Sequence, residues 1–191
     1  MKHLKTLILL TAVLCIIISC GRSDKTSKDK SKLKKGETEM VTLPFDITAL
    51  GNYVYFGPDT LPDPKCGEPY AAWRVIVDGS GSGTPIGEFT IHFDFCGDEE
   101  SKYGNNYGYL LSASGDTLFI SCEGQVFDGR LDDHPEFVTS YWKDPFTLEG
   151  GSGVFEGATG SGTTDDYNSS EDPYSHHHWV GTITMMKQEL E

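Results

Sequence analysis

Three consecutive histidines near the end of the chain, His176 to His178, are the residues whose type and spacing point most directly to chemistry. In a β-strand successive side chains alternate between two faces, so His176 and His178 would share one face while His177 points to the other. Two imidazoles at this spacing can bind Zn²⁺ when a third ligand joins them. His92, which alternates with Asp94 on another predicted strand, is the candidate third ligand. The alternative is an exposed polar strand end beside a loop, and both interpretations stay open.

The loop before these histidines carries oxygen ligands at alternate positions, Asp166, Asn168, Ser170 and Asp172. This spacing is typical of calcium loops, which bind the ion through carboxylate and carbonyl oxygens. The pattern is incomplete, because Glu171 stands where an EF-hand requires glycine and no bidentate glutamate follows at the required distance. A Ca²⁺ site and a solvated acidic loop are therefore both retained. No other cofactor is predicted.

A glycine-rich run over 150–162 does not match the known nucleotide or nucleophile motifs. A phosphate-binding loop ends in Gly-Lys-Ser/Thr, and this run contains no lysine. A nucleophile elbow requires G-x-S-x-G, and Val154 occupies the last position. Glycines within a strand instead mark bends or close approach of two backbones, as at the corners of a barrel. The carboxylates offer no selective pair, so we predict no catalytic residue, and a protein that is not an enzyme is the favoured interpretation.

Charge is divided sharply along the chain, whose formal net charge is −14. Residues 21–35 carry seven Lys and Arg against two Asp, whereas residues 36–191 carry six Lys and Arg against 27 Asp and Glu. The first block is rich in Ser and Lys and lacks aromatic residues, which predicts a disordered tether. The second block is too acidic to neutralise phosphates, so nucleic acid is excluded as a partner.

Residues 39–191 form the predicted folded domain, and their pattern is typical of an all-β protein. Turn signals recur at short intervals, and residues 88–96 alternate apolar and polar side chains. We expect an antiparallel barrel of about eight strands, since closure removes exposed edges. The predicted strands cover 53–56 (weak), 72–77, 88–96, 107–113, 117–127, an interrupted strand over 137–141 and 146–148, 154–163 and 179–186.

Three cysteines fall in this domain, so one intramolecular disulfide at most can form. Cys66 lies in a proline-rich loop and Cys96 at a strand end, and this is the pair we expect to be joined. Cys122 shares a strand face with Leu118 and Ile120, which predicts a buried, inert thiol.

The N-terminus resembles a bacterial lipoprotein signal peptide. Lys2 and Lys5 precede an apolar run over 7–18, which is shorter than the roughly 20 residues of a membrane-spanning helix. Ser19 then precedes Cys20. The resemblance implies a signal peptide over 1–19, acylation of Cys20, and a lipidated tether over 20–38. The chain would thus be an outer membrane lipoprotein of a bacterial cell envelope, anchored through Cys20, with the membrane face undetermined.

The run 150–158, GGSGVFEGA, resembles the signature strand of the allene oxide cyclase barrel family, whose superfamily includes dirigent proteins and many secreted bacterial proteins. Three further segments follow the order seen in those bacterial members, namely 79–90, 112–118 and 181–184. Together they cover roughly residues 73–186. The resemblance implies an eight-stranded, calycin-like antiparallel barrel with a central cavity. The family's catalytic positions cannot be matched here, so no activity is implied.

Function is predicted as a choice between three classes. The favoured one is a lipid-anchored module that binds a small apolar ligand or a partner in the barrel mouth. The second is an enzyme that acts on a lipid-like substrate within the cavity. The third is a structural or interaction subunit, such as a homo-oligomer, whose barrel is filled by its own side chains. A cavity with convergent polar groups would favour the first two.

Overall fold

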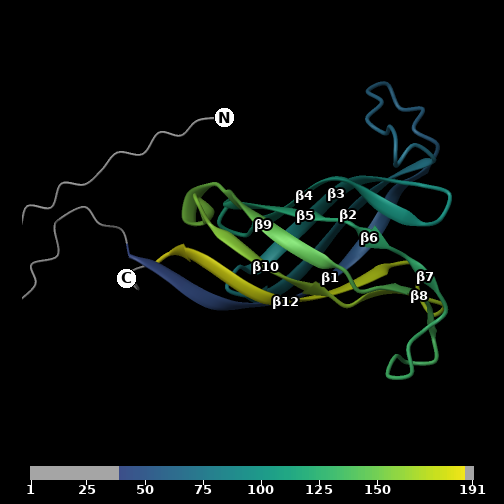
Figure 1. Ribbon diagram of the computed structural model, residues 1–191. Helices are drawn as coiled ribbons and strands as arrows, with labels where there is room; N and C mark the ends of the chain where they lie inside the picture. The colour runs from purple at the N-terminus through teal and green to yellow at the C-terminus, as the bar shows by residue number, and fades with distance from the viewer. Residues whose placement is uncertain (1–38, 188–191) are drawn as a thin grey trace, which may run out of the picture. The chain divides into compact units, whose positions relative to one another are not determined.

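The computed structural model describes residues 39–187, and within them eight strands close into an antiparallel barrel (Figure 1). Their order around the barrel is β1-β2-β3-β4-β5-β9-β10-β12, and β12 pairs back to β1. The predicted fold class is therefore confirmed. The predicted signal peptide (1–19) and lipidated tether (20–38) lie outside the described residues. The barrel strands are β1 (Met40–Gly57), β2 (Trp73–Thr84), β3 (Gly87–Gly97), β4 (Lys102–Ser112), β5 (Thr117–Cys122), β9 (Pro145–Gly151), β10 (Thr159–Thr164) and β12 (Ser175–Met186).

Four short strands extend the wall at one end. Within the described residues, β11 pairs with the start of β12, β8 pairs with β11, and β7 pairs with β8, while β6 pairs with β4. β12 pairs with β10 from Trp179 to Thr184 and with β11 at Ser175 and His176. The wall therefore widens where β11 takes the place of β10. These strands are β6 (Gly124–Gln125), β7 (Phe127–Asp128), β8 (Val138–Trp142) and β11 (Asp166–Ser169).

The first strand is much longer than the sequence predicts. A weak strand was expected over 53–56, but β1 runs from Met40 to Gly57 and pairs with both β12 and β2. The sequence does not predict this longer strand because it contains Pro44, and proline within a run argues against a central strand. Pairing with β2 begins only at Asp46, so β1 has a single neighbour, β12, where Pro44 lies.

Other predicted strands also differ in extent, and 117–127 is divided into β5, β6 and β7. The segment 154–163 is not continuous, because the 3-10 helix η1 (Gly153–Phe155) precedes β10 and glycines with positive φ, Gly153 and Gly157, make the turn. The segments 137–141 and 146–148 do not form one strand either. The first overlaps β8 in the extension, and the second lies in β9 of the barrel.

One end of the barrel, here called the packed end, is filled by its own side chains. Its core lies next to the paired chain ends, where the amide of Lys187 donates to the carbonyl of Glu39. Inward glycines let the strands approach closely: a Cβ added at Gly81 would lie 2.2 Å from the Thr48 carbonyl oxygen. Gly160 and Gly162, within the glycine-rich run for which this role was predicted, show the same close approach, each with a Cβ position 2.2 Å from a carbonyl oxygen. The fully buried residues of this core include Phe45, Ile47, Leu110, Leu118, Phe146, Leu148, Phe155 and Ile183.

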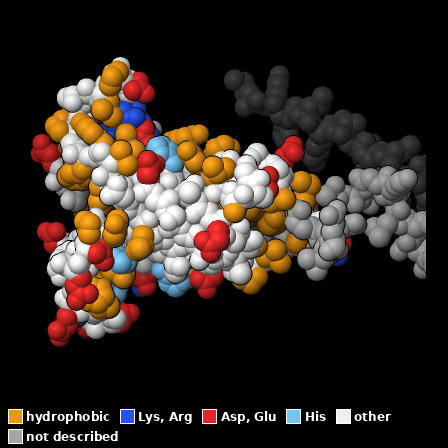
Figure 2. Space-filling model, turned by 180° about the vertical axis from the view of Figure 1, so that it is seen from behind, with side chains coloured by type: hydrophobic (Ala, Val, Ile, Leu, Met, Phe, Trp, Pro, Cys, Tyr) orange, Lys and Arg blue, Asp and Glu red, His pale blue; other side chains and the backbone are white. Residues whose placement is uncertain are grey.

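The opposite end, here called the hollow end, carries the long connections over 58–72 and 129–137 (Figure 1). Hydrophobic side chains gather on the surface of this end in Figure 2. Among the exposed large apolar residues are Val54 and Phe56 of β1 and Phe127 of β7. Across residues 39–187, no helix is both long and apolar enough to span a membrane.

Two neighbouring leucines on β4 test which face of this strand points into the core. Leu110 is fully buried, whereas Leu111 is 37% exposed. We expect Leu110→Ala to lower the free energy of unfolding by about 2–5 kcal/mol, because it leaves a cavity in the core. Leu111→Ala should cost less than about 1 kcal/mol. Urea unfolding of both variants measures this, and equal losses would contradict the assignment of faces.

Candidate functional site

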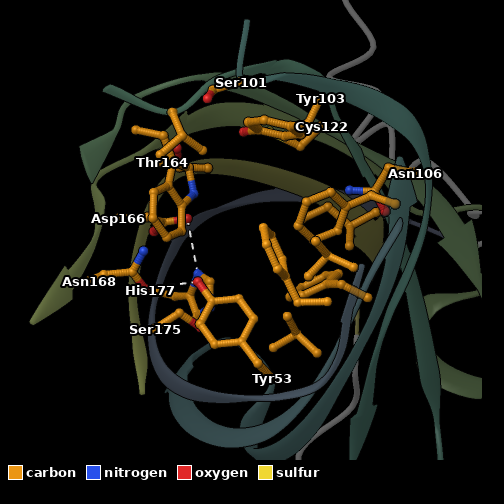
Figure 3. Close-up of a pocket in the computed structure, with 18 of the residues that line it drawn as sticks. Tyr53, Ser101, Tyr103, Asn106, Cys122, Thr164, Asp166, Asn168, Ser175 and His177 are labelled. Carbon is orange, nitrogen blue, oxygen red and sulfur yellow. Dashed lines mark hydrogen bonds and ion pairs between the residues drawn. The ribbon is translucent and has the colours of Figure 1, made fainter. Parts of the chain in front are cut away.

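The hollow end contains a cavity of about 520 Å³ inside the barrel (Figure 3). Its wall is mainly aromatic and aliphatic, and all three tryptophans of the chain contribute to it. In this part of the wall β12 pairs with β11, and β11 with β8, in place of β10. The barrel interior is therefore packed around Phe45, Leu110 and Ile183, with this cavity on one side of that core and a second pocket of about 530 Å³ at the end near Lys187. The aromatic lining comprises Phe56, Trp73, Phe93, Phe95, Trp142 and Trp179.

A line of three polar side chains, Asp166, His177 and Ser175, runs along one side of this cavity (Figure 3). His177 Nδ1 donates to Asp166 Oδ2 at 3.0 Å, and Ser175 Oγ lies 2.9 Å from His177 Nε2. Ser175 and His177 are two residues apart on β12, so both point into the barrel. All three side chains are buried, with Asp166 and Ser175 each 1% exposed. We call this set the Ser-His-Asp line.

The carboxylate of Asp166 is held by two further donors. The indole Nε1 of Trp179 donates to both of its oxygens, at 3.0 and 2.9 Å, and the amide of His178 donates to Oδ1 at 3.0 Å. Because a buried carboxylate is costly unless its oxygens are satisfied, these donors are what allow it inside the barrel. They also fix the plane of the carboxylate toward His177.

Gly51 of β1 provides the room for the other two members. A Cβ at this position would lie 2.4 Å from Ser175 Oγ and 3.0 Å from His177 Nε2. The Gly51 carbonyl oxygen also lies 3.3 Å from Ser175 Oγ. Any larger residue at 51 would displace Ser175, so the absence of a side chain here is part of the site.

Tyr53, two residues along β1, borders the same side of the cavity (Figure 3). Its hydroxyl donates to Asn168 Oδ1 at 2.8 Å, and Asn168 Nδ2 donates to Ser140 Oγ at 2.9 Å. Burial raises the pKa of the Tyr53 hydroxyl, and its hydrogen bonds with Asn168 and Ser175 partly oppose this shift. Tyr53 thus remains a neutral hydrogen-bond donor beside Ser175.

A second polar cluster lies on another part of the wall. The hydroxyl of Tyr103 donates to Asp144 Oδ2 at 2.9 Å and lies 3.3 Å from Cys122 Sγ. Burial, assisted by the nearby carboxylates Asp144 and Asp166, raises the pKa of the Cys122 thiol to about 12. Burial also raises the pKa of Asp144. Among the described residues, the buried Oδ1 of Asn106, another lining residue, has no hydrogen-bond partner.

The two cysteines expected to pair are joined in the structure. Cys66 and Cys96 form a disulfide with a Cα–Cα distance of 5.5 Å. The bond ties the long 58–72 connection to the end of β3. An ion-pair network that the sequence did not suggest supports the same loop: Arg74 contacts Asp94 at 2.6 Å and Asp59 at 3.1 Å.

The metal-ligand candidates do not come together. His176 and His178 share one face, as predicted, and this is the outer face, but they pair with different carboxylates, Asp172 at 3.0 Å and Asp46 at 3.1 Å. His92 pairs with Asp78 at 2.7 Å on a separate part of the wall.

The calcium candidates are likewise separated, because Asp166 points into the barrel while Asn168 bonds Tyr53 and Asp172 bonds His176. Over residues 39–187 no group of three or more His, Cys, Asp or Glu side chains is arranged to hold a metal ion. The zinc and calcium hypotheses therefore rest on the sequence pattern alone.

Sequence reasoning assigned no role to Ser175, His177 or Trp179. Strand alternation was the signal available, because it places these three residues on the face opposite His176 and His178. Their partner Asp166 was read as part of a loop, whereas it begins β11. The pairing of β11 with β12, which no local pattern indicates, brings Asp166 to His177.

Comparison with family models finds no match for this sequence, and comparison with curated proteins finds none. Among solved structures, the chain is similar to the pterocarpan synthase dirigent protein GePTS1. The TM-score is 0.47 at 13% sequence identity, over 82% of this chain and 91% of that one. This similarity assigns no role to any residue of the cavity.

The raised pKa of Cys122 predicts a specific pH dependence of its alkylation. The thiolate is the reactive form, and a pKa near 12 instead of about 8.5 leaves about 10³-fold less of it at pH 8.5. Iodoacetamide labelling of the native chain, followed at Cys122 by peptide mass spectrometry, should rise about tenfold per pH unit from pH 8 to 11. The same peptide in guanidinium is the control and should level off near pH 9. A plateau near pH 9 in the native chain would refute the shift.

Proposed function

We propose that the hollow end of the barrel binds a small, largely apolar ligand that carries one polar group. The observation behind this proposal is the cavity of about 520 Å³, whose aromatic wall is interrupted on one side by the Ser-His-Asp line. Ligand pockets in proteins are commonly of 300–1,000 Å³, apolar in most of their lining, with a few placed polar groups. A barrel filled by its own side chains fits this structure less well, since only the packed end is filled.

The chemistry of the wall favours a neutral ligand. The carboxylate of Asp166 lines the cavity, and that of Asp144 lies behind the lining residue Tyr103, so an anionic ligand would be repelled there with little water to screen the charges. A hydroxyl or carbonyl group suits the polar side better, because Tyr53 supplies a hydroxyl donor and Ser175 a hydroxyl that can accept. The aromatic rings favour a flat or branched apolar body.

The cell-envelope location remains part of this proposal. The proposed acylation of Cys20 and the proposed outer membrane location rest on the sequence pattern of the first 20 residues. Residue 39 lies at the packed end, paired through its carbonyl with Lys187. A chain anchored ahead of residue 39 would therefore enter the barrel at the end opposite the mouth of the cavity.

Ligand entry is testable with N-phenyl-1-naphthylamine, a neutral apolar fluorophore that accepts energy from tryptophan. Because all three tryptophans line the cavity, binding to the full chain should quench their emission and produce energy transfer. Val77→Phe projects a ring into the cavity and should weaken the affinity by about tenfold or more. Val180→Phe, at a 47% exposed outer position, is the matched control and should bind as the wild type does. Equal binding by both variants would place the dye outside the cavity.

Lipid anchoring is tested separately in a bacterial host fed with labelled palmitate. The wild-type full chain should incorporate the label and partition with membranes, whereas Cys20→Ala should do neither, because the thiol is the acylated group. Cys15→Ala is the control, since Cys15 lies within the predicted signal peptide. Label that persists in Cys20→Ala would refute the assignment.

A further inference from the structure

We infer that the Ser-His-Asp line is a nucleophilic triad, with Ser175 as nucleophile and His177 as its general base, and that the cavity hydrolyses carboxylic esters of apolar alcohols or acids. This inference rests on the proposed function, because the ester must first occupy the cavity. It assigns a reaction to residues that neither the sequence motifs nor the comparisons mark.

The hydrogen bonds set the direction of proton transfer. Asp166 accepts from His177 Nδ1 at 3.0 Å, so the imidazole carries a proton on Nδ1, and the form that acts as a base presents a lone pair on Nε2. Ser175 Oγ lies 2.9 Å from that lone pair, nearer than its 3.3 Å contact with the Gly51 carbonyl oxygen. A serine hydroxyl aimed at an imidazole that a carboxylate orients is the arrangement that activates serine for attack.

Asp166 is a positioning residue in this scheme. Trp179 Nε1 and the His178 amide hold its carboxylate, so it cannot rotate away from His177. When the imidazole gains the serine proton, the adjacent carboxylate stabilises the resulting cation. The apolar rings around the cavity strengthen this interaction by excluding water.

Tyr53 is the candidate donor to the oxyanion. Its hydroxyl interacts with Ser175 as well as Asn168 and stays neutral because burial raises its pKa. A hydroxyl beside the nucleophile can turn from Asn168 toward the carbonyl oxygen of a bound ester as negative charge develops there.

The reaction balances with water as the second substrate. Ser175 Oγ attacks the ester carbonyl carbon while its proton moves to His177 Nε2, and the carbonyl oxygen becomes the oxyanion. Collapse of this intermediate breaks the bond to the alcohol oxygen, which takes the proton from His177. Water then attacks the acyl-serine, again giving its proton to His177, and the carboxylic acid leaves as Ser175 regains its proton.

Location separates this arrangement from a structural hydrogen-bond network. A structural network is expected within packed core, but these three residues line the cavity. Ser175 and His177 themselves border the cavity, so an ester carbonyl held in it faces the serine.

Reactivity toward an alkyl fluorophosphonate tests the triad in the full chain. The probe should label Ser175, as identified by peptide mass spectrometry, and the chain should hydrolyse p-nitrophenyl hexanoate. His177→Gln should lower both rates by about 10³-fold or more, and Ser175→Ala should abolish labelling. Asp166→Asn should lower kcat while KM and the affinity for N-phenyl-1-naphthylamine stay unchanged. Ser121→Ala, whose side chain bonds Glu149 outside the cavity, is the matched control and should behave as the wild type does.

The outcomes separate the two proposals. A chain that binds the naphthylamine but shows no label on Ser175 overturns the triad and leaves ligand binding intact. A chain that does neither overturns both. The wild-type peptide map decides the point even where Ser175→Ala fails to fold, and labelling of a different serine counts against the inference.

Discussion

The pairing of β1 with β12 is the constraint on which the rest of the structure depends. It joins the first and last described strands over the register Met40–Met186 to Gly51–Ser175 and so closes the sheet. Closure satisfies the backbone groups that an open sheet leaves at its edges. It also places Gly51 and Tyr53 of β1 beside Ser175 and His177 of β12, so the same pairing that completes the barrel assembles one side of the cavity.

The change of partner along β12 divides the barrel into two functional halves. Where β12 pairs with β10, glycines at inward positions bring the strands together and large apolar side chains fill the interior. Where it pairs with β11, the wall is wider and the interior stays hollow. Apolar packing is thereby concentrated at the packed end, and the proposed ligand cavity occupies the hollow end.

Much of the fold could be predicted from the sequence because several strands follow from the order of residue types within one segment. The alternation in 88–96 and the inward glycines are of this kind. The sequence does not predict the full length of β1, because Pro44 interrupts its pattern. It does not predict β11, because that strand consists of only four polar residues. The cavity residues were harder still, since Asp166 meets His177 only through strand pairing. Residue types at alternate positions indicated which side chains share a face, but not which face surrounds an empty interior.

The burial of Asp166 bears on why the hollow end is polar at all. Removing a carboxylate from water costs several kcal/mol, and replacing a buried charged group and its partners by apolar residues is often neutral or stabilising. A barrel that needed only stability would gain little from a carboxylate that requires Trp179, His177 and a backbone amide to satisfy it. The core of the packed end consists of apolar side chains, which avoid the desolvation free energy of a buried carboxylate. The costly arrangement occurs where the interior is open, and this is the distribution expected of residues that act on what enters the cavity.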